Sequence, residues 1–151
     1  MGKKESLTVP GRYDKIRRIC EFVADGAKRA GFDEDAVFQV QLACDEACTN
    51  IIEHTYKEED VGDITIDWEI GQQKFVITIQ DNGEPFDTSD IPPAPVPPDP
   101  LPANADEEYD LKIGGLGVFF MRQLMDRVEF SYNQGSGNVL KMEKRLPDAK
   151  E

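Results

Sequence analysis

The stretch FVITIQDNGEPFD, residues 75–87, decides how the rest of the sequence is interpreted. The strand period places Phe75, Ile77 and Ile79 on one face, which is wholly apolar, and Val76, Thr78 and Gln80 on the other. By the same alternation Asp81 falls on the apolar face, because side chains two residues apart point the same way. A buried carboxylate is costly unless it has a partner. Asp81 therefore either leaves the strand in an Asp-Asn-Gly turn or faces a group that hydrogen-bonds to it.

Apolar spacing divides the rest of the chain into helices and strands. Helical spacing predicts three helices: one from Ile16 to a stop at Gly31, one capped by Asp33 that reaches about Tyr56, and one over 118–125. Alternating or apolar runs between turn residues predict five strands, over 5–9, 63–70, 74–81, 128–132 and 139–146. The length of 151 residues fits a single domain, 1–151.

Composition limits the classes of partner. The formal net charge of −13 argues against direct nucleic-acid binding, which needs clustered Lys and Arg; the acidity also fits a purely solubilising role. No apolar stretch is long enough to span a membrane, and the start MGKKESLTV lacks the apolar centre of a secretory signal. We therefore expect a cytoplasmic protein that does not bind membranes.

The three cysteines, Cys20, Cys44 and Cys48, form no C-x-x-C pattern, which fits a reducing compartment. Cys44 and Cys48 are four residues apart and share a helix face. This spacing is compatible with half of a metal site, but the single histidine, His54, completes it poorly. We interpret both as small buried residues and expect no metal held by thiolates.

Residues 88–113 contain seven of the ten prolines, then an acidic patch, and no periodicity. A structureless stretch of this length inside a small domain is typical of a functional lid or a disordered linker, and a P-x-x-P ligand is a further alternative. Gly114, Gly115 and Gly117 follow it and precede the third predicted helix. Uncovered amides at a helix N-terminus can bind an anion, although tight turns and close packing also require glycine.

The second predicted helix carries Glu46 and Asn50, one turn apart on one side. An amide oxygen is a suitable ligand for Mg²⁺, and a carboxylate beside phosphates can remove a proton from an attacking hydroxyl. The alternative is a solvated helix face. We accept that alternative for four other acidic residues, Asp45, Glu53, Glu58 and Glu59.

The order of these features resembles the three ATP-binding boxes of the GHKL superfamily. A helix with E-x-x-x-N is followed by a strand ending in D-x-G-x-P-F, a long lid, and G-G-L-G opening a helix. Three segments, DEACTNIIEH, DNGEPFD and GGLGVFFMRQLMD, are similar in particular to the bacterial anti-sigma factor serine/threonine kinases. The resemblance covers about residues 5–146.

This resemblance implies an α/β fold of the Bergerat type, a two-layer sandwich of a mixed β-sheet packed against helices, with ATP between sheet, helices and a Pro-rich lid at about 88–113. The implied roles are an adenine acceptor at Asp81, close approach of the base at Gly83, a Mg²⁺ ligand at Asn50, a general base at Glu46 and phosphate-binding amides at Gly115, Leu116 and Gly117. Two features depart from the family pattern. The glycine box begins with Ile113-Gly114 rather than with the first glycine of G-x-G-x-G, and the lid is unusually rich in proline.

The function that the resemblance implies is a protein kinase that transfers the ATP γ-phosphate to a Ser or Thr of an anti-sigma-factor antagonist. It also implies sequestration of a sigma factor and assembly as a homodimer. Three alternatives are a nucleotide-gated binding module without phosphoryl transfer, a simple ATPase, and a Pro-rich scaffold that binds no nucleotide. A kinase and a binding module would both keep Asp81, Gly83 and Asn50, but only the kinase needs Glu46 as a base. Glu46 and Asn50 together therefore favour catalysis over the binding module.

Overall fold

The computed structural model describes residues 3–83, 121–133 and 137–147. The five predicted strands are all present, within about two residues of their predicted ends. The elements are β1 (Lys3–Pro10), α1 (Tyr13–Arg29), α2 (Glu34–Asn50), η1 (Ile51–Tyr56), β2 (Asp63–Ile70), β3 (Lys74–Asp81), β4 (Arg127–Asn133) and β5 (Gly137–Arg145). Of the third predicted helix, residues 121–125 are described, and 121–124 of these are helical. The predicted lid at 88–113 and the glycine box Gly114–Gly117 lie outside the described residues.

The second predicted helix differs from a single α-helix. Asp33 caps it as expected, since its side chain accepts a hydrogen bond of 2.8 Å from the backbone N–H of Ala36. At Asn50, however, the α-helix passes directly into the π-helical segment η1, which ends at Tyr56. Lys57 then adopts a left-handed conformation, with φ of 70°, and reverses the chain.

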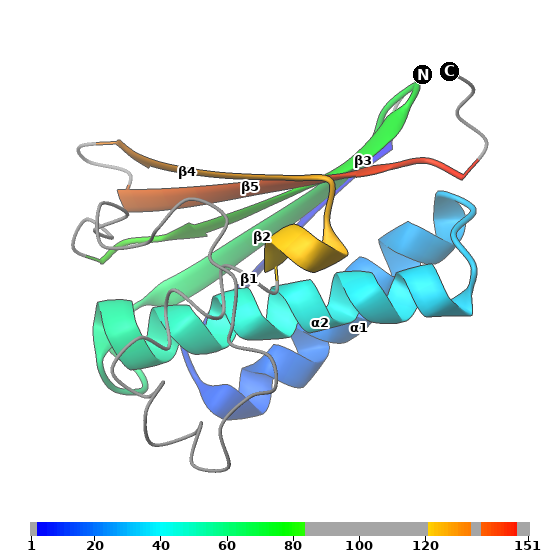
Figure 1. The fold of residues 1–151 in the computed structure, drawn as a ribbon. Coiled ribbons are helices and arrows are strands. Elements are labelled where there is room, and N and C mark those ends of the chain that lie inside the picture. Colours follow the sequence, from blue (N-terminus) through cyan, green and yellow to red (C-terminus); the bar gives the residue numbers. More distant parts are fainter. Residues whose placement is uncertain (1–2, 84–120, 134–136, 148–151) are drawn as a thin grey trace, which may run out of the picture.

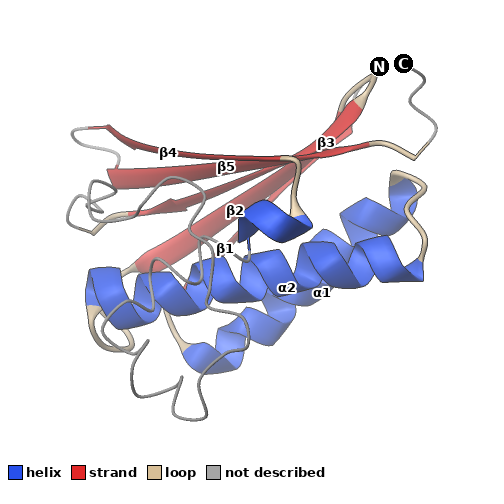
Figure 2. Ribbon diagram, in the orientation of Figure 1, coloured by secondary structure: helices blue, strands red, loops and turns tan. Residues whose placement is uncertain are grey.

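The molecule has two layers, a sheet and the helix pair α1 and α2 on one of its faces (Figures 1 and 2). The strand order is β1-β2-β3-β5-β4. This confirms the α/β sandwich, but the expected mixture of strand directions is not found among the described strands, whose four pairings are all antiparallel. For β1 and β2, the reason is that α1 and α2 return the chain to the end where β1 stops: Pro10 at the end of β1 pairs with Asp63 at the start of β2.

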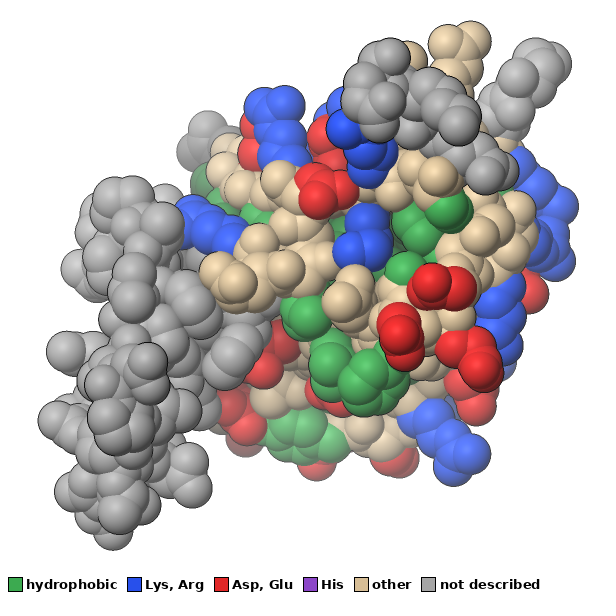
Figure 3. Space-filling view, turned by 45° about the vertical axis from the view of Figure 1, so that its right-hand side comes forward, with side chains coloured by type: hydrophobic (Ala, Val, Ile, Leu, Met, Phe, Trp, Pro, Cys, Tyr) green, Lys and Arg blue, Asp and Glu red, His purple; other side chains and the backbone are tan. Residues whose placement is uncertain are grey.

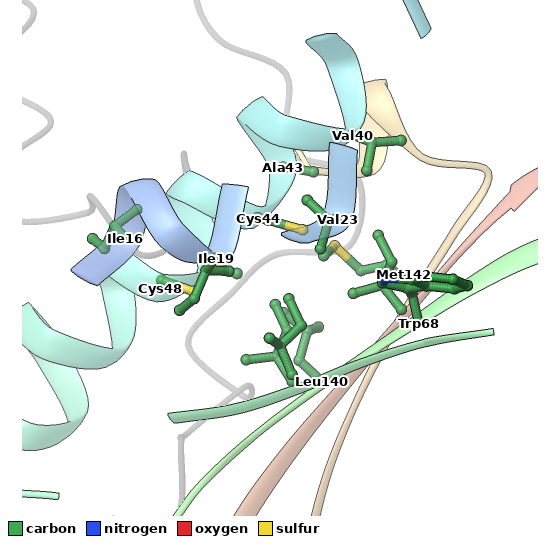
Figure 4. Packing of buried hydrophobic residues seen from close by; sticks show 14 of the residues in the cluster. Ile16, Ile19, Val23, Val40, Ala43, Cys44, Cys48, Trp68, Leu140 and Met142 are labelled. Carbon is green, nitrogen blue, oxygen red and sulfur yellow. The ribbon is translucent and has the colours of Figure 1, made fainter. Parts of the chain in front are cut away.

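Alternation along the central strands fills the space between the layers. The side chains that face the helices are almost completely buried: Ile64, Ile66, Trp68, Phe75, Ile77, Ile79, Leu140 and Met142. The helices contribute residues such as Val23 of α1 and Val40 of α2 to the same layer (Figure 4). Burying one such side chain stabilises the fold by about 1.5–3 kcal/mol, so this layer supplies the main driving force for folding.

Cys44 and Cys48 lie in this core with free thiols, as expected for small buried residues (Figure 4). Burial raises the pKa of both thiols well above its usual value. They are therefore protonated near neutral pH and contribute to packing.

The surface carries both signs of charge. On the face shown in Figure 3, Asp and Glu side chains are interspersed with Lys and Arg side chains, with apolar groups between them. None of the described helices is long and apolar enough to cross a membrane.

Candidate functional site

A pocket lies between the C-terminal end of α2, η1 and the ends of β3 and β5. Its described walls are mostly apolar, with a small number of polar groups, which is the usual composition of a small-molecule site. The lining residues are Ala47, Asn50, Ile51, Thr55, Ile79, Asp81, Met121, Phe130, Asn138, Val139 and Leu140. Asn50 and Asp81, which the sequence placed in two separate motifs, therefore face one cavity.

Asp81 is the last residue of β3 and is 4% exposed, so the predicted phase of the strand is confirmed. Its Oδ1 accepts hydrogen bonds from the backbone N–H of Gly83, at 2.8 Å, and from Nδ2 of Asn138, at 2.9 Å. Burial raises the pKa of Asp81, while these hydrogen bonds act to lower it. Both readings of the sequence thus hold in part: the chain turns after Asp81, and the buried carboxylate also has partners.

Asn138 is a site residue that sequence reasoning missed. It is 8% exposed, and it follows Gly137 at the start of β5. The signal that could have found it is its phase, since Asn138 precedes Leu140 and Met142 by two and four residues on the buried face. It is therefore a polar side chain at a core position, as Asp81 is, and the two are bonded to each other.

Asn50 is 7% exposed and sits at the junction of α2 with η1. Its Oδ1 is buried and has no hydrogen-bond partner within the described residues. Leaving a buried acceptor unpaired costs about 1–3 kcal/mol, so a ligand group that pairs with it gains that energy. The position is consistent with the frequent occurrence of π-helical segments at functional sites.

Asn50 offers a single amide oxygen, which fits a cation that takes most of its ligands from a bound molecule and from water. No group of three or more His, Cys, Asp or Glu side chains able to hold a metal is found in the described part of the chain. Mg²⁺ in nucleotide enzymes commonly uses one or two protein oxygens together with phosphate oxygens and water. The amide oxygen of Asn50 is suited to be such a single protein ligand.

Glu46 lies one helical turn before Asn50 and is half-buried. It is not among the residues that line the described cavity. Burial is the main cause that raises the pKa of Glu46, and the negative charges of Asp45 and Glu53 raise it further. A carboxylate with a raised pKa is a stronger base than an exposed one. The four acidic residues expected on a solvated face, Asp45, Glu53, Glu58 and Glu59, are exposed.

Gly83 is required by packing in this structure. A Cβ atom added at Gly83 would lie 2.2 Å from Cγ2 of Thr55 in η1, which no side chain tolerates without a shift. The absence of a side chain thus lets η1 approach the end of β3 closely, and Thr55 lines the cavity beside it. The predicted phosphate-binding residues Gly115, Leu116 and Gly117 lie outside the described residues.

Comparison with known proteins gives consistent results. Residues 9–144 match the family model described as the histidine kinase-like ATPase domain. The chain is 36% identical over 140 residues to serine-protein kinase RsbW of Listeria monocytogenes serotype 4a, covering 93% of this chain and 87% of that protein. It is 35% identical over the same shares to RsbW of Listeria innocua, and 33% identical over 133 residues to RsbW of Bacillus cereus, covering 88% and 80%.

Proposed function

The chain belongs to the histidine kinase-like ATPase domain family, and from this premise we propose that it is an ATP-dependent serine/threonine protein kinase. Its relatives at 33–36% identity are named serine-protein kinases, which favours a kinase over a nucleotide-gated binding module. The observation that carries the proposal is the placement of Asp81 and Asn50 in one cavity. Asp81 is a buried acceptor, and Asn50 has a buried oxygen that lacks a partner within the described residues.

Asp81 is suited to recognise adenine. The 6-amino group of adenine is a hydrogen-bond donor, whereas guanine has a carbonyl oxygen at the same position. Oδ1 of Asp81 already accepts hydrogen bonds from the N–H of Gly83 and from Nδ2 of Asn138, so the carboxylate is held in one orientation as an acceptor. A guanine oxygen there would meet another acceptor, and buried polar groups without partners give strong discrimination. Gly83 would let the base approach the chain beside Asp81.

Asn50 would hold Mg²⁺ on the nucleotide, because its amide oxygen is buried and lacks a partner within the described residues. When bound, the ion neutralises phosphate charge. The amides of Gly115, Leu116 and Gly117 would bind the phosphates, as uncovered N–H groups at a helix start do.

Glu46 would act as the general base. The proton of the incoming Ser or Thr hydroxyl passes to the Glu46 carboxylate as the hydroxyl oxygen forms a bond to the γ-phosphorus. The bond from that phosphorus to the bridging oxygen of the β-phosphate breaks, and ADP is released. The raised pKa of Glu46 makes this transfer more favourable than it would be to an exposed carboxylate.

The protein partners form part of the same proposal. We propose that the phosphate acceptor is an anti-sigma-factor antagonist, and that the protein sequesters a sigma factor when the antagonist is phosphorylated. The support is the similarity of DEACTNIIEH and DNGEPFD to the anti-sigma factor kinases. A homodimer and a cytoplasmic location are also proposed; β1 at the edge of the sheet offers exposed backbone for pairing, and the three free cysteines fit a reducing compartment.

Phosphoryl transfer to a protein tests this function. The purified chain is incubated with Mg²⁺ and γ-labelled ATP together with recombinant anti-sigma-factor antagonists from the same genome. We expect label on a Ser or Thr of one antagonist with wild type, and much slower labelling with Glu46→Gln. Tight ATP binding without any labelled protein would support the binding module, and release of phosphate without an acceptor would support a simple ATPase.

A further inference from the structure

The hydroxyl of Tyr56 joins the ends of two strands next to the cavity. It donates a hydrogen bond of 2.5 Å to the backbone carbonyl of Asp63 and accepts one of 2.9 Å from the backbone N–H of Asn82. Tyr56 is the last residue of η1 and is 6% exposed. It is not among the cavity-lining residues, so any effect on a ligand must pass through its neighbours.

The strand register shows what this hydroxyl replaces. The last pair of the β2–β3 ladder is Ile64 with Asp81. If the ladder continued by one residue, Asp63 and Asn82 would face each other. Their carbonyl and N–H are joined instead through the Tyr56 hydroxyl. The side chain therefore marks the point where β3 stops pairing with β2, directly after Asp81.

Close packing fixes the Tyr56 ring. A Cβ added at Gly62 would lie 2.7 Å from the Tyr56 hydroxyl oxygen, and one added at Gly11 would lie 3.1 Å from two ring carbons. These two glycines are themselves joined by a hydrogen bond of 2.7 Å from Gly11 N to Gly62 O. The ring thus occupies a slot that only glycines can line, and its hydroxyl has a defined position.

The next amide along the chain is the one that binds Asp81. Asn82 N–H is directed to Tyr56, and Gly83 N–H is directed to Oδ1 of Asp81. We propose that Tyr56 is a positioning residue for nucleotide recognition. By holding Asn82 away from β2 it sets the turn that brings Gly83 N–H onto the Asp81 carboxylate, and so sets the direction of the adenine acceptor. This inference rests on the proposed ATP site.

Tyr56→Phe tests the role of the hydroxyl, because phenylalanine keeps the ring that fills the slot. Tyr132→Phe is the matched control, since Tyr132 is 43% exposed on β4. Asn82→Pro is a second variant that removes the N–H donor and leaves Tyr56 intact; the residue before it, Asp81, is in the extended conformation that a following proline favours. Two readouts are measured: amide hydrogen exchange of the nucleotide-free protein, and the affinities for ATP and GTP with Mg²⁺.

In Tyr56→Phe we expect faster exchange of both the Asn82 and Gly83 amides, and an ATP affinity about tenfold lower, the effect of losing one well-placed hydrogen bond. GTP affinity should change less, so the ratio of ATP to GTP affinity falls, whereas Tyr132→Phe leaves it unchanged. The inference would be overturned if the Gly83 amide of Tyr56→Phe exchanged at the wild-type rate. It would also be overturned if Tyr56→Phe lost ATP affinity and GTP affinity equally. If wild type binds no ATP, the proposed function fails, and the exchange rate of the Gly83 amide alone decides whether Tyr56 sets the turn. If Tyr56→Phe does not fold, the exchange rate of the Gly83 amide in Asn82→Pro decides this question.

Discussion

Asn138 on β5 donates a hydrogen bond of 2.9 Å to Oδ1 of Asp81 on the neighbouring strand β3. Both side chains are nearly inaccessible to solvent, and both line the cavity that Asn50 also faces. The pair explains how a carboxylate can remain on the buried face of a strand. Its acceptor is paired with donors from within the fold, and the pairing leaves it oriented for a ligand.

The first prediction concerns Asn138→Leu, which keeps the approximate size of the side chain and removes the donor. We expect the free energy of unfolding to fall by about 1–3 kcal/mol near neutral pH, because Asp81 loses a buried partner. Asn133→Leu on β4 is the control, since Asn133 is exposed. Urea unfolding measures both variants.

The pH dependence of this loss has a defined sign. Burial already raises the pKa of Asp81 in the folded state, and Asn138 opposes that shift, so removing Asn138 raises the pKa further. An acid with a raised folded-state pKa destabilises the fold above that pKa, where it is ionised, and the cost disappears as the pH falls through it. The difference between variant and wild type should therefore shrink in acid; a difference that grew on acidification would contradict this account.

The second prediction concerns Glu46. With Glu46 as the base, the rate of phosphoryl transfer should rise with pH as this carboxyl ionises. Because the pKa of Glu46 is raised, that rise should occur at higher pH than for an ordinary glutamate. Glu46→Gln should lower the rate by about 10²–10⁴-fold and remove this acid limb. Single-turnover transfer measured across pH 4 to 8, roughly the range in which carboxyl groups with raised pKa titrate, provides the check.

Asp45→Asn changes the pKa of Glu46 while keeping the Glu46 carboxyl group itself. Asp45 is exposed, and its negative charge is one of the causes that raise the pKa of Glu46. Neutralising it should move the acid limb to lower pH without a large loss of the plateau rate. If Glu46→Gln transferred phosphate at the wild-type rate, Glu46 would not be the base.

The third prediction concerns the contact of η1 with the end of β3. Gly83→Ala places a Cβ 2.2 Å from Cγ2 of Thr55, so we expect a destabilisation of about 1–3 kcal/mol, typical of overpacking. Thr55→Ser removes the methyl group that causes the clash. The double variant should therefore recover most of the lost stability, which thermal or urea unfolding can measure.

The two substitutions form a double-mutant cycle. Strong coupling would show that Gly83 is needed for packing against Thr55. Additive effects of the two changes would mean that another neighbour limits the space at Gly83, such as Cε1 of Tyr56, which would lie 3.3 Å from the added Cβ.

Much of the fold and part of the site could be predicted from local patterns. The alternation that runs from Phe75 to Ile79 extends to Asp81, so the period of a strand placed Asp81 on the apolar face, although it did not decide whether the chain turned away there. The spacing of Glu46 and Asn50 likewise indicated one side of a helix. These features depend on residues close together in sequence, which is why periodicity finds them.

Features that depend on contacts between distant segments were not predicted. Asn138 meets Asp81 only because β5 inserts between β3 and β4, and the strand order is not written in the pattern of any one strand. The role of Tyr56 depends on the register of β2 and β3 and on the change from α-helix to π-helix at Asn50. The antiparallel pairing of β1 with β2 follows from the return path through α1 and α2, which helix lengths alone do not determine.

The fourth prediction tests the central claim, that Asp81 makes this cavity an adenine site. Calorimetry in the presence of Mg²⁺ should compare wild type with Asp81→Asn, using ATP and GTP as ligands. We predict that wild type binds ATP in preference to GTP, and that Asp81→Asn loses about tenfold or more of its ATP affinity while remaining folded. Equal binding of ATP by wild type and Asp81→Asn, or no ATP binding by folded wild type, would contradict the account.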